Sequence, residues 1–359
     1  MKTLIIGFTK IKYMPYLSFY TDCVENSENV DLLYWDRDAT TDIAPNNVNR
    51  VFKLDYKMSD DLPLVKKVKG FIKFRTFALG VLKKNHYDKI ILLHSTPAIL
   101  LSDYILNNYS GKFILDYRDV TYERIGLYKK RVGQLVLNSF ATFVSSEGFC
   151  EFLPESDKIY ISHNLQRSSL AYKGARANTP REQNPLRISF WGLIRQVEIN
   201  KQIISALKND NRFQLHYYGR EQQQALELKS FCESEKVDNV FFHGEYLPEE
   251  RFDFIPETDI IHNLYEHGKT EGLAMGNKYY DGIVFGIPLM CSVESHMGNR
   301  VLAENTGFAC NPYSESFKDD ILNYYSSINW TDFEKACEKA LEKVLEEYDN
   351  GNKIIKSFL

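Results

Sequence analysis

Short apolar runs alternate with longer stretches of helical spacing along most of the chain. The runs are rich in β-branched and aromatic residues, which favour buried strands, and several end at a glycine or a polar residue. Strands that alternate with helical stretches predict parallel sheets covered by helices on both faces. We expect strands at 2–7, 30–35, 51–56, 89–95, 112–116, 141–145, 158–165, 186–192, 213–219, 240–246, 259–265 and 289–292.

A polar stretch divides these strands into two series. Residues 166–185 contain two prolines and show no periodicity, which is typical of an interdomain linker. The chain has 359 residues, which suits two hydrophobic cores better than one. We therefore expect an α/β protein with two Rossmann-like domains, each a doubly wound parallel sheet, over 1–165 and 186–335. The two domains would face a cleft, and an amphipathic helix over 336–359 would pack back towards the first domain.

Composition and charge exclude several classes of protein. The formal net charge of −4 argues against a general nucleic-acid binder, which would carry a basic excess. The six cysteines lack the close spacing of a metal site or a disulfide framework, so we expect reduced thiols and no metal. The first apolar run is too short for a signal peptide, and no run is long enough to span a membrane. The sequence therefore predicts a cytoplasmic location.

The segment Glu271 to Ser292 combines a glycine-rich loop, a short helix beginning near Asn277 and a buried strand. A helix N-terminus beside such a loop favours anions, because its first N–H groups are unpaired. Asn277 and Asp281 lie four apart on that helix and Lys278 and Asp281 three apart, so the three side chains converge on overlapping faces. This mixture suits a sugar nucleotide, whose diphosphate needs donors and whose ribose needs a carboxylate. The alternative is an amphipathic helix whose Lys and Asp form a solvated pair.

The same segment resembles the retaining glycosyltransferases of GT-B architecture, in the family-four-like group that builds bacterial surface polysaccharides. In that group an acidic residue, usually Glu, lies five residues before a Gly and seven before a Pro, and it holds the ribose. Asp281 takes that position, followed by Gly286 and Pro288. Leu273 stands where many members carry another Glu. The resemblance implies a nucleotide-sugar donor as substrate, no cofactor and no metal ion.

Polar residues follow several strands of the first domain, where parallel sheets bind ligands. The loop after the first strand carries Gly7 and Thr9 but no G-x-G-x-x-G pattern, which argues against NAD. His94 follows a later strand, and a lone His at such a place is often hydrogen-bonded scaffold. Arg118 and Asp119 follow the next strand and resemble a D-x-R-D segment beside the transferred sugar. We expect Asp119 to orient or deprotonate an acceptor hydroxyl, and Arg118 to pair with a phosphate or with Asp119; a purely structural ion pair is the alternative.

The second domain opens with a strand that ends at Gly192, with Arg195 and Lys201 further on. This resembles the G-x-x-R…K arrangement of the same transferases, which implies that both cations neutralise the donor diphosphate as the leaving group departs. Surface charges at a helix start are the alternative reading. Loops after the next two strands cradle the nucleobase in the family. The candidates there are Tyr218, Gly219, His243, Gly244, Glu245 and Tyr246.

Residues 65–84 carry seven Lys or Arg and no acid, with aromatic and aliphatic residues between them. Such a segment is typical of a helix that lies on an anionic membrane. In a polysaccharide-building transferase it would bring the enzyme to an acceptor carried on a polyprenyl diphosphate, at the inner face of the plasma membrane. A solvated charged face over a buried aromatic one is the alternative.

Three classes of function stay open on the sequence. The order of the motifs favours a glycosyltransferase that moves a sugar from a nucleotide-sugar donor to a saccharide acceptor in surface (capsular) polysaccharide synthesis. A sugar-nucleotide epimerase would use the same scaffold. A catalytically silent nucleotide- or sugar-binding relative is favoured by Asp281 in place of Glu and by Leu273.

Overall fold

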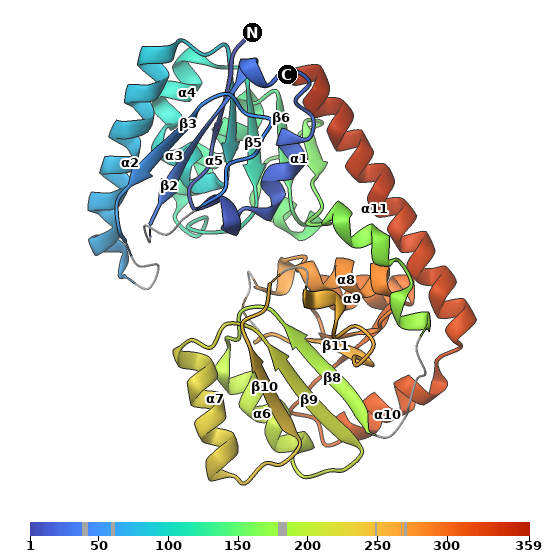
Figure 1. The fold of residues 1–359 in the computed structure, drawn as a ribbon. Coiled ribbons are helices and arrows are strands. Elements are labelled where there is room, and N and C mark those ends of the chain that lie inside the picture. The colour runs from blue at the N-terminus through green and yellow to red at the C-terminus, as the bar shows by residue number, and fades with distance from the viewer. Residues whose placement is uncertain (38–41, 59–61, 179–184, 248–249, 267, 269–270) are drawn as a thin grey trace. The chain divides into compact units, whose positions relative to one another are not determined.

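The computed structural model describes residues 1–37, 42–58, 62–178, 185–247, 250–266, 268 and 271–359. The chain forms two compact units (Figure 1). Unit 1 comprises Met1–Asn164 and Leu345–Leu359, and unit 2 comprises Leu165–Val344. Each unit has its own parallel sheet, so the expected α/β class with two doubly wound sheets is confirmed.

The sheet of unit 1 has seven parallel strands in the order β3-β2-β1-β4-β5-β6-β7. The chain winds outward from β1 to β3 and then returns to the other side of β1, so the order reverses between β1 and β4. The strands are β1 Thr3–Ile6, β2 Val30–Asp36, β3 Val51–Asp55, β4 Lys89–Leu93, β5 Phe113–Tyr117, β6 Ala141–Val144 and β7 Ile159–Ile161.

Helices cover both faces of this sheet (Figure 1). Alternate strand residues, among them Ile5 and Ile91, pack with α1 and with the end of the terminal helix α11. On the other face Trp35 stacks on Phe74 of α2, with ring centroids 5.8 Å apart. The helices are α1 Ser18–Thr21, α2 Leu64–Asn85, α3 Ser95–Leu100, α4 Ser102–Asn108, α5 Gly126–Asn138 and α11 Trp330–Phe358.

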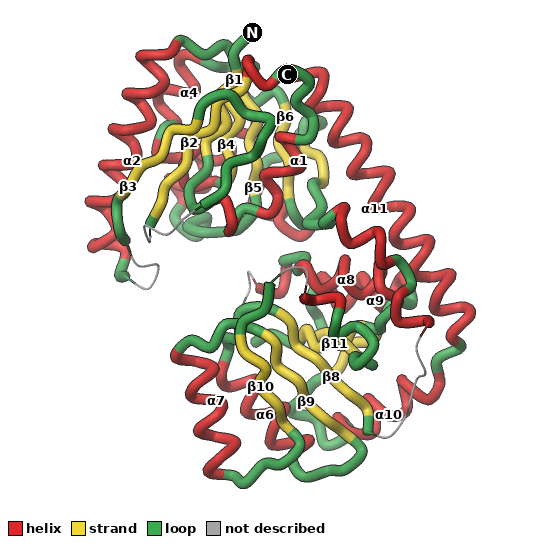
Figure 2. Tube along the Cα trace, in the orientation of Figure 1, coloured by secondary structure: helices red, strands yellow, loops and turns green. Residues whose placement is uncertain are grey.

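The sheet of unit 2 has six parallel strands in the order β10-β9-β8-β11-β12-β13, and its order reverses between β8 and β11 (Figure 2). Helices α6, α7 and α10 share one hydrophobic core with one face. Helices α8 and α9 cover the other face, where Gly282 approaches Leu289 and Gly298 approaches Ala309. The elements are β8 Leu186–Trp191, α6 Val197–Leu207, β9 Phe213–Tyr218, α7 Gln223–Ser234, β10 Val240–Gly244, β11 Ile260–Asn263, α8 Asn277–Phe285, β12 Leu289–Ser292, α9 His296–Glu304, β13 Gly307–Cys310 and α10 Phe317–Ser327.

Residues 166–178 of the expected linker belong to unit 2 in the structure, and residues 179–184 lie outside the described part. Two 3-10 helices, η5 Arg167–Tyr172 and η6 Ala175–Asn178, belong to unit 2. The Gly174 N–H donates to the Val284 carbonyl of α8, and Arg176 forms a buried ion pair with Asp259 at 2.5 Å. These bonds attach the segment to unit 2, because a buried charge such as that of Arg176 requires a partner.

The terminal helix is longer than the sequence pattern indicates. α11 begins at Trp330, and its residues from Leu345 onward belong to unit 1. There His163 Nε2 lies 2.6 Å from Glu347 Oε2, and Gly351 leaves room for the ring of Phe19.

Candidate functional site

Unit 1 contains a cavity of about 430 Å³ at the carboxyl ends of its central strands. Thr9, His94 and Asp119 line it from the loops after β1, β4 and β5. The structure thus brings together three residues that the sequence placed at separate strand ends. Thr96 and a set of aromatic and basic side chains complete the lining: Phe8, Tyr13, Tyr16, Arg37, Lys67, Phe71, Arg118 and Tyr122.

His94 and Asp119 form the polar pair of this cavity. The His94 Nδ1 atom accepts a hydrogen bond from the Thr96 N–H at 3.2 Å, which caps α3. In the neutral ring the proton is then on Nε2, and that atom lies 3.4 Å from Asp119 Oδ2. The Asp119 side chain is 68% exposed, so its carboxylate is open to a ligand while His94 orients it.

Arg118 does not pair with Asp119, which corrects one of the two roles expected for it. Its Nε lies 2.8 Å from Asp116 Oδ1, and its other nitrogens donate to Asn164 and Ser162. The guanidinium also lies over the Tyr16 ring, 4.3 Å from its centroid. Burial raises the pKa of Asp116 despite this cation. Arg118 therefore stabilises the wall of the cavity, and its charge is already neutralised.

Gly7 is a packing position, although the sequence placed it on the acceptor side. It is buried, and a Cβ atom there would lie 2.7 Å from the Met14 side chain. The cavity lining begins at Phe8. Gly7 thus shapes the loop and is not among the residues that line the cavity.

In unit 2 the loop after β8 carries Arg195 into a cavity of about 480 Å³. Gly192 has φ +125°, a conformation that L side chains rarely adopt, and the chain can turn there from β8 into the loop. Gly219 follows β9 and lies so close to the Gly192 carbonyl that a Cβ would overlap it. Strand packing therefore requires a glycine at position 219, and its expected place among the nucleobase contacts stays a prediction.

Lys201 is paired with two glutamates in the structure. Its Nζ lies 2.6 Å from Glu227 Oε1 on α7 and 3.5 Å from Glu198 Oε1 on α6. The cavity at Arg195 is lined by both glutamates but not by Lys201. The expected pair of cations facing one diphosphate is thus not formed in this structure, because Lys201 is held between the helices.

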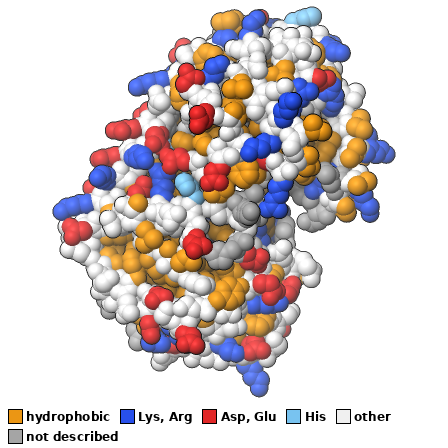
Figure 3. Space-filling model, turned by 180° about the vertical axis from the view of Figure 1, so that it is seen from behind, with side chains coloured by type: hydrophobic (Ala, Val, Ile, Leu, Met, Phe, Trp, Pro, Cys, Tyr) orange, Lys and Arg blue, Asp and Glu red, His pale blue; other side chains and the backbone are white. Residues whose placement is uncertain are grey.

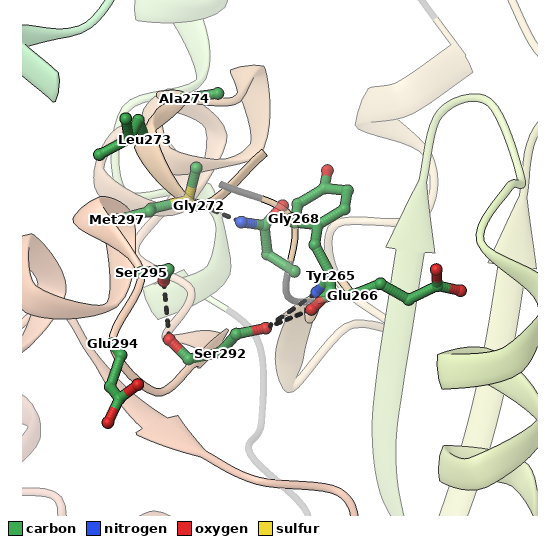
Figure 4. Close-up of a pocket in the computed structure, with 11 residues that line it drawn as sticks. Tyr265, Glu266, Gly268, Gly272, Leu273, Ala274, Ser292, Glu294, Ser295 and Met297 are labelled. Carbon is green, nitrogen blue, oxygen red and sulfur yellow. Dashed lines mark hydrogen bonds between the residues drawn. The ribbon is translucent and has the colours of Figure 1, made fainter. Parts of the chain in front are cut away.

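A second cavity of unit 2, of about 300 Å³, lies at the ends of β11 and β12 (Figure 4). The Ser292 hydroxyl accepts from the Tyr265 N–H at 2.9 Å and donates to the Tyr265 carbonyl, and the Ser295 hydroxyl donates to the Ser292 carbonyl. Glu266 borders both this cavity and the one at Arg195, so the two adjoin. The remaining lining residues are Asn263, Gly268, Gly272, Leu273, Ala274, Glu294 and Met297.

The second cavity is lined by hydroxyl, amide and carboxylate groups. Asn263 is 2% exposed, and its Oδ1 accepts no hydrogen bond among the described residues. A buried amide oxygen without a donor is unfavourable, so a ligand that donates a hydrogen bond to it would gain binding free energy. The sequence pattern did not single out Asn263, Ser292 and Ser295. Their only signal was their position at or after the ends of predicted strands.

Helix α8 begins at Asn277, as the sequence predicted, but it is buried rather than amphipathic. Lys278 Nζ donates to the Tyr265 hydroxyl at 3.1 Å and lies 4.0 Å from the centre of the Phe190 ring. Asp281 accepts from Arg251, whose Nη1 lies 3.0 Å from Oδ1. Lys278 and Asp281 therefore have separate partners, which excludes the solvated pair that the sequence left open.

The residues expected at the nucleobase form an aromatic cluster with Phe254. The Tyr218 ring stacks on Phe254 at 4.0 Å and on His243 at 4.2 Å, while Tyr246 meets Phe254 edge-on at 5.3 Å. Burial raises the pKa of Tyr246 to about 12. Gly244 has φ +83°, which permits the turn that leads from β10 to Tyr246.

The described residues contain no group of three or more His, Cys, Asp or Glu side chains that could hold a metal ion. The polar groups of the three cavities are hydroxyls, amides, guanidinium groups, separate carboxylates, the His94 imidazole and the Lys67 ammonium group. Such groups suit a hydroxylated and anionic organic ligand.

These features define a class of fold: two doubly wound parallel sheets with strand-end cavities in each unit. Known structures of that class match nearly the whole chain. Sucrose-phosphate synthase from Thermosynechococcus elongatus aligns with a TM-score of 0.70 at 12% identity, over 99% of this chain and 94% of that one. HepE of Anabaena, solved with UDP and glucose, gives 0.67 at 12% identity, over 99% and 98%. The chain therefore has the GT-B fold of these proteins.

A third similar structure is the lipopolysaccharide outer core galactosyltransferase WaaB, with a TM-score of 0.64 at 13% identity over the full length of both chains. No protein-family model and no curated protein matches the sequence. At such identities the likeness concerns the fold, and the function is argued from the site.

Proposed function

We propose that this protein is a glycosyltransferase that moves a sugar from a nucleotide-sugar donor, bound by unit 2, to a saccharide acceptor, bound by unit 1. The observation that carries the proposal is the pair of adjoining cavities that share Glu266 at the strand ends of unit 2. One presents the cation of Arg195 beside Glu198 and Glu227, and the other presents hydroxyl and amide groups beside Glu266 and Glu294. The cation suits the diphosphate of a nucleotide sugar, and the hydroxyl and amide groups suit its sugar.

The expected role of Arg195 follows from the charge that develops on the donor during the reaction. Cleavage of the sugar–phosphate bond builds negative charge on the leaving diphosphate, and a cation already in place stabilises that charge. Arg195 is exposed in its cavity and can supply this cation without a metal ion. Among similar structures, HepE was solved with UDP, which supports a uridine nucleotide as the first donor to test.

The sugar of the donor would occupy the second cavity. Asn263 Oδ1 offers an acceptor for a sugar hydroxyl, and Ser295 and Glu266 offer further polar contacts. Asp281 would hold the ribose, since each carboxylate oxygen accepts more than the single bond that Arg251 makes. We propose retention of configuration on the resemblance of the Asn277-to-Pro288 segment alone.

The acceptor hydroxyl would meet Asp119 in the cavity of unit 1. An exposed carboxylate held by His94 can accept the proton of a hydroxyl or orient it for attack. The aromatic side chains Phe8, Tyr13 and Tyr122 provide surfaces for sugar rings.

Helix α2 supports attachment of the protein to an anionic membrane and hence a lipid-linked acceptor in surface polysaccharide synthesis. Val65 is 84% exposed and Ile72 is 59% exposed, while Lys66, Lys69 and Lys73 are exposed on neighbouring turns. Figure 3 shows hydrophobic and basic side chains side by side on the flank of unit 1 that α2 forms. Among the described residues no helix is long and apolar enough to cross a bilayer.

A second candidate is a relative that binds a nucleotide or a sugar without transfer. The pairing of Lys201 with Glu227 favours it, because that charge is already neutralised.

The proposed function is tested by incubation with UDP-, GDP- and CMP-sugars, with thermal shift as the readout of binding and product analysis as the readout of chemistry. A transferase binds one donor class and forms a glycosylated acceptor, or slowly hydrolyses the donor. Isomerised sugar nucleotide would identify an epimerase instead. Binding without any product would identify the silent relative.

A further inference from the structure

We propose that Asn200, a buried residue of α6, is a positioning residue that holds the loop bearing Arg195 in the shape that meets the donor diphosphate. This inference rests on the proposed function for the role of Arg195. The shape of the loop itself is independent of that function and can be measured separately.

The loop is held in a conformation that requires support. Gln196 has φ +62°, in the left-handed region that non-glycine residues rarely adopt. Such a conformation persists only where surrounding contacts determine it. The Asn200 Nδ2 group supplies two of them, because it donates to the carbonyls of Arg195 and Gln196, each at 2.9 Å.

The orientation of the Asn200 amide is fixed by partners from two strands. Its Oδ1 accepts from the Tyr217 hydroxyl of β9 at 2.9 Å and lies 3.2 Å from His262 Nε2 of β11. His262 Nδ1 accepts from the Leu264 N–H, so the neutral ring carries its proton on Nε2 and donates to Asn200. Asn200, Tyr217 and His262 are each at most 2% exposed. Since backbone carbonyls can only accept, the amide nitrogen must face the loop.

The His262 ring remains a donor at physiological pH. Burial and the charge of Lys278 lower its pKa to about 3, so the ring is neutral and its tautomer is set by Leu264. A buried and fully bonded polar network of this kind specifies one local geometry.

The same network joins the two loops that line the donor cavities. The Gln196 Oε1 atom accepts from the Glu266 N–H at 3.0 Å, and the Gln196 N–H donates to Gln224 Oε1 at 2.8 Å. Glu266 borders both cavities. Asn200 therefore supports Arg195 directly and the loop after β11 through Gln196.

The structure offers a matched pair of variants. Asn200→Asp keeps the size and the acceptor of the side chain but removes the donor to the two carbonyls. Tyr217→Phe removes one bond to the amide oxygen and leaves both bonds to the loop. Asn200→Leu replaces the amide by an apolar group of similar size and serves if the Asp variant does not fold, as judged by circular dichroism.

The first readout is amide hydrogen exchange at 193–196 and 264–266 in the full chain. We expect faster exchange at these amides in the Asn200 variant, and near-normal exchange there in Tyr217→Phe, with β8 and β9 protected as in the parent protein. Unchanged exchange in the loop would overturn the proposal, whatever the protein binds.

The second readout is affinity for UDP and for uridine, which lacks the diphosphate. We expect the Asn200 variant to bind UDP about 10- to 100-fold more weakly, since small displacements of a charged contact cost that much, and to bind uridine within about threefold of normal. In an Arg195→Ala background the Asn200 change should have little further effect, because coupled residues are non-additive. Equal losses for UDP and uridine, or full additivity with Arg195→Ala, would contradict a role through Arg195. A parent protein that binds no nucleotide would refute the proposed function, and hydrogen exchange would still decide whether Asn200 shapes the loop.

Discussion

Arg251 and Asp281 form an ion pair inside unit 2, with Nη1 at 3.0 Å from Oδ1 and at 3.4 Å from Oδ2. Both side chains are 9% exposed, and the second guanidinium nitrogen donates to Gln166 and Ser169 of the segment before β8. Asp281 is therefore a buried carboxyl. Its burial raises its pKa to about 6, although the cations of Arg251 and Lys278 favour the charged form.

This pKa predicts a pH dependence of donor binding. The raised pKa means that Asp281 is largely protonated at about pH 5 and ionised at about pH 7.5, and only the carboxylate accepts both ribose hydroxyls. We expect the affinity for a UDP-sugar to be about tenfold weaker at the lower pH, as one pKa unit implies. Isothermal titration calorimetry with the sugar nucleotide avoids the second phosphate ionisation of free UDP. Asp281→Asn should bind more weakly at high pH with a flat profile; a persistent slope in that variant would exclude Asp281.

Arg195 and Lys201 are predicted to differ, although the sequence motif treats them alike. Arg195→Ala should lower the rate of transfer by roughly two to four powers of ten, because it removes the cation at the leaving diphosphate. Lys201→Ala should cost less than about tenfold, because Lys201 is paired with Glu227. Steady-state rates of transfer at saturating donor measure the loss in each variant. Equal and large losses in the two variants would show that Lys201 leaves Glu227 when the donor binds.

Asp119 is predicted to act on the acceptor and not on the donor. Asp119→Asn should lower kcat by roughly two to four powers of ten and leave the affinity for UDP unchanged, because the variant keeps the shape but loses the base. Asp103→Asn is the matched control, since Asp103 is an exposed carboxylate of the same unit paired with Arg75. A normal kcat in the Asp119 variant would assign the acceptor hydroxyl to another group.

Arg118 is predicted to stabilise unit 1 through its buried pair with Asp116. Arg118→Met leaves Asp116 buried without a cation and should lower the free energy of unfolding of unit 1 by about 3–5 kcal/mol. Arg75→Met breaks an exposed pair and should cost less than about 1 kcal/mol. Hydrogen exchange of the β4 and β5 amides measures unit 1 alone. Normal protection together with lost activity would instead place Arg118 on the substrate.

Helix α2 is predicted to bind anionic membranes. Each exposed Lys near such a surface contributes about 1 kcal/mol, and the exposed Val65 and Ile72 add shallow insertion. Sedimentation with anionic vesicles at low salt should be lost when Lys66, Lys69 and Lys73 are replaced by Ser, and it should weaken at high salt. The matched control replaces Lys335, Lys339 and Lys353, which are exposed on α11. Equal losses of vesicle binding in the two variants would show that the net charge of the protein, and not helix α2, determines the binding.

Both parallel sheets could be predicted from the sequence, because the alternation of apolar runs with helical stretches is a local property. The start of α8 at Asn277 could be predicted from the glycine-rich loop that precedes it. The candidate residues of unit 1 could be predicted from the rule that ligands bind at the carboxyl ends of parallel strands. The meeting of Thr9, His94 and Asp119 in one cavity is consistent with that rule.

The partners of the charged residues could not be predicted. Asp116 is two residues from Arg118, yet the sequence equally allowed Asp119, and only the direction of the side chains at the end of β5 decided between them. Lys201 is paired with Glu227, 26 residues away on another helix. Asp281 is paired with Arg251, which no sequence motif had indicated.

The sequence by itself thus determined the order of most strands and helices, although not β13, and the division into two sheets. It also indicated the strand ends that carry the candidate residues. Those properties depend on the period of the hydrophobic residues and on the direction of the chain, and both can be read from short segments of the sequence. Only the tertiary structure decided which cations remain exposed and which are neutralised, and which buried amide holds the Arg195 loop. Charge pairing and burial depend on distances between residues far apart in the chain, and a linear pattern does not contain those distances.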